Sequence, residues 1–140
     1  GVSREDRRAI SQYGAAEVPP EIIMRHYRRY YRLEGKKLVE CRDVIEWATY
    51  FETKNANRRI ADEMVGNSYI STVFLGIDHQ FGNGPPLLFE TMVFGGLLDQ
   101  EQDRCSTLKE AVAMHAAMVL RVRREDIRWR RWLKFFMDLF

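Results

Sequence analysis

Four side chains with acid–base or metal-ligating chemistry lie in the second half of the chain: Asp78, His79, Glu90 and His115. Imidazole and carboxylate groups are the usual ligands of zinc, and they are also common general acids and bases in enzymes. Their spacing contains no HExxH, HxH or CxxC arrangement, which metal sites often show. We therefore predict no metal and no other cofactor. The catalytic alternative is a nucleotide-binding or metal-dependent hydrolase centred on His79, Glu90 and His115.

Each of these side chains also has a structural interpretation. Asp78 and His79 end a predicted strand, where an aspartate caps a loop and a histidine closes a turn through hydrogen bonds. His115 falls on the apolar face of a predicted helix, where one satisfied ring nitrogen is typical. Glu90 lies in an apolar strand, and a buried carboxylate needs a partner. We expect that partner to be one of His115, Arg58, Arg59 and Arg104.

The segment between these groups, HQFGNGPP (residues 79–86), combines two glycines with two prolines. Glycine permits positive φ, whereas proline fixes φ and withholds a donor, so the loop is shaped by both constraints. No Gly-Lys-Ser/Thr follows, which argues against a phosphate loop. A nucleotide would instead stack on Phe81 and place its phosphates on arginine. The predicted ligand-binding set is Asp78, His79, Phe81, Asn83, Glu90, Arg104 and His115.

Arginines are mixed with aromatic residues near both ends of the chain. Seven arginines face four acids in residues 1–32, eight basic residues face thirteen acids in 33–120, and seven basic residues face three acids in 121–140. This mixture is typical of protein interfaces, single-strand nucleic acid binders and membrane-surface helices, and packing on the chain's own domain is a fourth interpretation. At helical spacing one face of the C-terminal segment carries Trp129, Trp132, Leu133, Phe136 and Phe140. The predicted partner-binding set is Arg28, Arg128, Trp129, Arg131 and Trp132.

Hydrophobic periodicity predicts the elements that position these residues. We expect helices over 3–14 and 21–31, a hairpin over 30–33 and 37–41, and a helix over 44–53. Strands follow over 60–65, 68–78 and 87–94, with an acidic loop at 97–105 and a helix over 107–122. Residues 124–140 continue that helix or form another. The fold class is α+β: a mostly antiparallel sheet of about four to five strands, helices on one face, and a C-terminal amphipathic helix.

Composition limits the remaining classes. With 140 residues, 46% of them hydrophobic, the chain is long enough for one domain, and we divide it into an N-terminal helical extension (1–30), a core (31–122) and a basic aromatic helix (123–140). Two cysteines do not make a disulfide scaffold, and no apolar stretch approaches about 20 residues. No serine or cysteine has the context of a nucleophile. We therefore expect a cytoplasmic protein that binds rather than catalyses.

The segment STVFLGIDHQFGNGPPLLFETMVFGG (residues 71–96) resembles small uncharacterised proteins of tailed phages and prophages. The resemblance continues through Arg104–Thr107, Glu110–Ala111 and Met114–His115, and brings no chemistry with it. It implies a phage or prophage origin and a cytosolic accessory factor in the host cell. Such a factor would act as a counter-defence inhibitor, by occluding a host or defence protein or sequestering a ligand. The further expected partner is a second copy, and a nucleotide or nucleic acid is the alternative.

Overall fold

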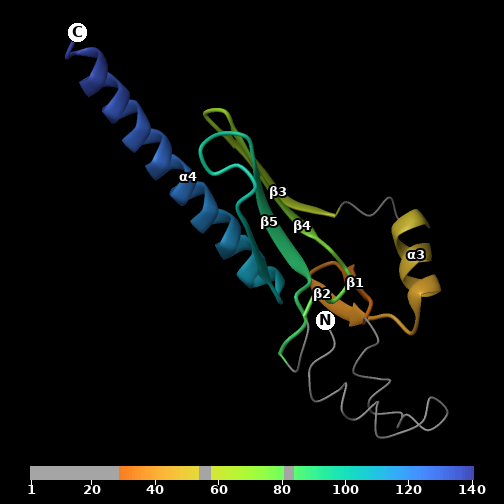
Figure 1. Cartoon of the computed structure of the whole chain (residues 1–140). Coiled ribbons are helices and arrows are strands. Elements are labelled where there is room, and N and C mark those ends of the chain that lie inside the picture. Colours follow the sequence, from red (N-terminus) through yellow and green to blue (C-terminus); the bar gives the residue numbers. More distant parts are fainter. Residues whose placement is uncertain (1–28, 54–57, 81–83) are drawn as a thin grey trace, which may run out of the picture.

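The computed structural model describes residues 29–53, 58–80 and 84–140 (Figure 1). Its elements are β1 (Tyr31–Glu34), β2 (Lys37–Glu40), α3 (Val44–Thr53), β3 (Arg59–Val65), β4 (Ser68–Phe74), β5 (Phe89–Phe94), β6 (Gln102–Cys105) and α4 (Leu108–Met137). The α+β class is confirmed. The helix expected over 3–14, most of the one expected over 21–31, and the site candidates Arg28, Phe81 and Asn83 lie outside the described residues. Tyr30 and Tyr31 are extended, because Tyr30 bridges Ile77 and Tyr31 begins β1.

The strands form two antiparallel sheets. β1 and β2 make the expected hairpin as a separate two-stranded sheet, and the larger sheet has the order β3-β4-β5-β6. Strand β6 corrects the prediction of a loop over 97–105. Its exposed, charged residues hide the strand in the sequence, whereas its backbone pairs with β5, with Glu90 opposite Arg104. An edge strand of this kind is specified by its neighbour more than by its own composition.

Helix α4 covers one face of the larger sheet. Side chains alternate across a strand, so Ile70, Thr72 and Phe74 of β4 point to the same face. Ile70 belongs to a buried cluster with Met118, Val119 and Val122 of the helix, while Phe74 belongs to a second cluster that contains Ala111. Between the two clusters the Thr72 hydroxyl lies within hydrogen-bonding distance of both Thr91 and His115. The core is therefore two apolar clusters with a polar layer between them.

Helix α3 packs at the other end of the sheet, near the β1–β2 hairpin (Figure 1). Asp43 caps it by accepting the Glu46 N–H at 2.9 Å, as the sequence predicts. The ring of Phe51 lies 6.2 Å from that of Phe74, which joins α3 to the second cluster. Gly76 follows β4 with φ +70°, and a Cβ there would lie 2.7 Å from Trp47 Nε1. Only glycine fits this close approach.

The C-terminal segment continues α4 without a break. Thr107 caps the helix by accepting the Glu110 N–H, and the helix then runs to Met137. Its buried residues end at Val122, and every residue from Ile127 onward is exposed among the described part of the chain. Figure 1 shows the blue half of α4 extending past the ends of β3, β4 and β5. We call residues 123–140 the projection.

Candidate functional site

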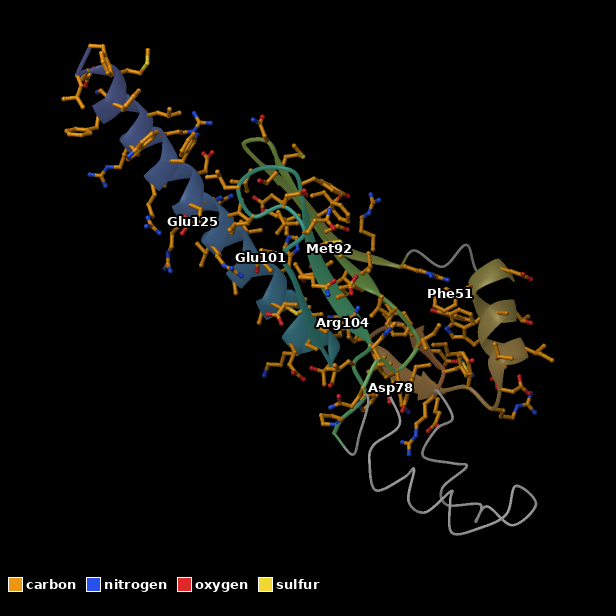
Figure 2. All side chains as sticks on the ribbon, in the orientation of Figure 1. Phe51, Asp78, Met92, Glu101, Arg104 and Glu125 are labelled. Carbon is orange, nitrogen blue, oxygen red and sulfur yellow. The ribbon has the colours of Figure 1, made fainter. Side chains whose placement is uncertain are left out.

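Asp78 holds together the loop that follows β4. Its carboxylate accepts the backbone N–H of Gln80 at 2.7 Å and of Leu87 at 3.1 Å, so one side chain joins the two ends of the loop. The backbone N–H of His79 donates to the Leu87 carbonyl at 3.2 Å. Figure 2 shows Asp78 at the hairpin end of the sheet, far from the projection. These contacts fit the structural interpretation of Asp78.

Glu90 pairs with Arg104 across β5 and β6. The Arg104 Nε donates to Glu90 Oε2 at 2.8 Å, which confirms one of the four expected contacts. The pair lies on the sheet face opposite α4, because Thr91, the next residue along β5, points toward the helix. Neutralised by its cross-strand partner, the Glu90 carboxylate stabilises the edge strand β6.

His115 lies on the other face of the same sheet. It is 9% exposed, and its Nδ1 lies 2.8 Å from the Thr72 hydroxyl. The structure therefore separates Glu90 from His115 by the thickness of the sheet. The three residues of the catalytic alternative do not converge on one site, and no group of three or more His, Cys, Asp or Glu in residues 29–53, 58–80 and 84–140 is arranged to hold a metal ion.

Both cysteines are buried, free thiols. Burial raises the pKa of Cys105 to about 11 and also raises the pKa of Cys41. Since the thiolate is the nucleophilic form, neither residue is activated for covalent chemistry at neutral pH. The remaining candidate among the described residues is an exposed surface that could bind a partner.

Among the described residues, the largest exposed aromatic surface lies on the projection. Trp129 and Trp132 stack with ring centroids 5.2 Å apart, Trp132 and Phe136 stack at 5.4 Å, and Phe140 meets Phe136 edge-on at 5.2 Å. Trp132 is 51% exposed and Phe136 is 43% exposed. With Leu133 these rings form a continuous apolar strip, which we call the aromatic stripe (Trp129, Trp132, Leu133, Phe136 and Phe140).

The aromatic stripe continues the row of residues that packs on the sheet. Successive helical residues are rotated by about 100°, so Trp129, Phe136 and Phe140 fall on the same side of α4 as Val122 and Met118. Of the predicted partner-binding residues, Trp129 and Trp132 belong to the stripe, Arg128 flanks it, and Arg131 lies on the back of the helix. Arg128 pairs with Glu125 and Arg130 with Asp126, both at 2.9 Å. The stripe thus faces the space beyond the end of the sheet.

A cavity of about 170 Å³ opens where the projection leaves the sheet. Its walls combine apolar side chains with two carboxylates, and include Leu97, Leu98, Val122, Glu125, Asp126 and Trp129. Figure 2 shows Glu125, one of the lining residues, on α4. The turn between β3 and β4 closes one side, since a Cβ on Gly66 would lie 3.2 Å from Asp126 Oδ1. An acidic, partly apolar hollow therefore adjoins the base of the stripe.

The sequence predicts the stripe but misses the cavity. The apolar spacing from Trp129 to Phe140 is visible in the sequence, whereas Leu97 and Leu98 come to Val122 only through the pairing of β5 with β6. The leucine pair directly after two glycines (residues 95–98) was the available signal. Comparison with family models, curated proteins and solved structures gives no match. Neither described helix is long and apolar enough to cross a bilayer.

Proposed function

We propose that this protein is a non-catalytic binding protein whose projection docks onto another protein. The observation that carries this proposal is the aromatic stripe. The buried residues of α4 end at Val122, and the stacked rings that follow at helical spacing are exposed. Trp129, Trp132 and Phe136 have the i, i+3, i+7 spacing of a helix that anchors in a partner's groove. Aromatic residues flanked by arginine also dominate the energetics of protein interfaces.

The charges of the projection favour a partner surface that is apolar with an acidic rim. Six basic residues face three acids between residues 123 and 140. Two of the basic residues already pair with Glu125 and Asp126, which leaves a net positive surface around the rings. Complementary charge raises the rate of encounter and selects among partners, while the rings supply most of the affinity.

The biological role that we propose is that of a phage accessory factor that occludes a host or defence protein. Its support is the resemblance of residues 71–96 to proteins of tailed phages and prophages. Occlusion needs only a rigid body and a docking element, and a helix anchored on one side by a packed sheet provides both.

The test compares two single substitutions on the projection. Phe136 belongs to the stripe, whereas Phe135, 65% exposed, points away from it. Immobilised wild-type protein and the F135A variant should retain the same proteins from a host lysate, and F136A should lose them. Retention of the same proteins by F136A would exclude the stripe as the docking surface.

A further inference from the structure

The partner that best fits the aromatic stripe can be inferred from the shape of the molecule itself. The stripe faces the space beyond the sheet, and at its base lies a cavity with two carboxylates. The projection carries an excess of basic residues away from a body, residues 33–120, in which thirteen acids outnumber eight basic residues. Trp129 already lines this cavity, but one molecule cannot bring the far end of its stripe, Phe136 and Phe140, back to its own cavity, because all of them lie along one straight helix.

On this basis, and resting on the proposed function, we propose that the stripe binds a second copy of this chain, with the two projections packed antiparallel so that the end of each enters the cavity of the other.

The spacing along α4 fixes the register. His115, Met118, Val122, Glu125, Trp129, Trp132 and Phe136 alternate at three and four residues. The first three pack on the sheet, and the last four continue with the spacing of the seam of a helix pair. With the two-fold axis between Arg130 and Arg131, Trp129 opposes the partner's Trp132, and Val122 opposes the partner's Leu139. Phe136 then lies beside the partner's Glu125. This register overlaps the two projections over nearly their full length.

The cavity accepts the side chains that this register delivers. A void of about 150 Å³ is large enough for a benzene ring, so this open hollow of about 170 Å³ has the volume for one phenylalanine ring. The partner's Phe140 arrives beside Val122, against Leu97 and Leu98. The partner's Lys134 arrives opposite Ile127, next to Asp126, and adds one cation beside the two carboxylates that already pair with Arg128 and Arg130 of their own helix.

The apolar area is sufficient for a specific pair. A fully exposed aromatic side chain presents about 150–250 Å², and the five stripe residues keep between 37% and 97% of their surface. The stripe therefore offers about 600 Å² per copy. Pairing two stripes buries about 1,200 Å², the lower end for a specific interface, before the exposed Leu97 and Leu139 are added.

The first experiment is sedimentation of the full chain from about 1 to 200 µM. We expect a monomer–dimer equilibrium that F136A weakens by at least about tenfold and that F135A leaves unchanged. A wild-type protein that stays monomeric would overturn the inference. If F136A then still loses a captured host protein, the proposed function survives with a different partner. A dimer unaffected by F136A would also overturn the inference, because the two copies would then associate through another surface.

The second experiment tests the antiparallel arrangement through spin labels on introduced cysteines, since both native thiols are buried. At a rise of 1.5 Å per residue, labels at Arg124→Cys should lie about 20 Å apart and labels at Lys109→Cys about 65 Å apart. A parallel pair would give about 10 Å at both positions and overturn the inference. Binding of wild-type protein to anionic phospholipid vesicles, with no dimer, would assign the stripe to a lipid surface instead.

Discussion

The Thr72 hydroxyl lies 2.8 Å from His115 Nδ1 on one side and 2.6 Å from the Thr91 hydroxyl on the other. All three side chains are buried between α4 and the sheet. A hydroxyl both donates and accepts, so Thr72 can satisfy both neighbours at once. Thr72 of β4 therefore joins His115 of α4 to Thr91 of β5 inside the described core.

Replacing Thr72 with valine should destabilise the protein by about 1–3 kcal/mol. The shape is kept, but His115 Nδ1 and the Thr91 hydroxyl both lose a partner in a buried layer. Urea unfolding at a fixed protein concentration measures the loss. Thr91→Val is the matched control. It removes only the contact between Thr72 and Thr91, leaves the contact between Thr72 and His115 intact, and should lower stability less. Equal losses in the two variants would show that Thr72 has no bridging role.

Gly76→Ala should destabilise the fold more than Gly35→Ala. Both glycines have positive φ, +70° and +62°, so alanine is strained by a similar amount at either position. At Gly76 the new Cβ would also lie 2.7 Å from Trp47 Nε1 and 2.9 Å from the Phe51 ring, whereas nothing lies within 4 Å at Gly35. The difference in urea midpoint between the variants isolates the close approach. Identical midpoints would mean that α3 moves aside freely.

Stability should fall as the pH rises from about 9 toward about 11. Burial, followed by the negative charge of Glu110, raises the pKa of Cys105 from 9.0 to about 11 in the folded protein. The unfolded chain therefore loses this proton first, and alkaline pH favours unfolding until the folded thiol also ionises. Thermal unfolding across this range should show a steeper decline for wild-type protein than for Cys105→Ala. Parallel profiles would assign the decline to other groups.

Substitutions on the two halves of α4 should change the stability of the protein by different amounts. Val119→Ala, at a side chain only 5% exposed, should destabilise the protein by about 1–3 kcal/mol. Trp132→Ala should change the stability of the monomer by no more than about 0.5 kcal/mol, because no described element packs against that ring. Urea unfolding at a concentration that keeps the protein monomeric makes the comparison. A large loss from Trp132→Ala would mean that the ring belongs to the core.

The elements with strong local signals were predictable from the sequence. The caps at Asp43 and Thr107 and the alternating strands of the central hairpin belong to this group, because local chemistry decides them. Strand β6 was missed because three charged or polar residues before Cys105 become a strand only beside β5. The position of Glu90 opposite His115 across the sheet also depends on pairing, since one residue of register exchanges the two faces.

The candidate site divides in the same way. The aromatic stripe is a property of helical spacing alone, and the sequence predicts it. The sequence does not predict the cavity at its base, because Leu97, Val122 and Asp126 meet only after two strands and a helix have packed. Whether the terminal segment packs on its own body was an open alternative in the sequence. Because α4 is longer than the sheet, the terminal segment extends past it and does not pack on its own body.

The polar layer around Thr72 fixes the position of α4 along the sheet. Two smooth apolar surfaces could slide past each other, but moving α4 by one turn, about 5.4 Å, would carry His115 away from its hydroxyl partner and leave it unsatisfied. The hydrogen bond between His115 and Thr72 thus sets how far α4 extends past the end of the sheet. In an antiparallel pair that reach determines the separation of the two sheets. A contact in the interior of each molecule would therefore set the distance between the two sheets of the pair.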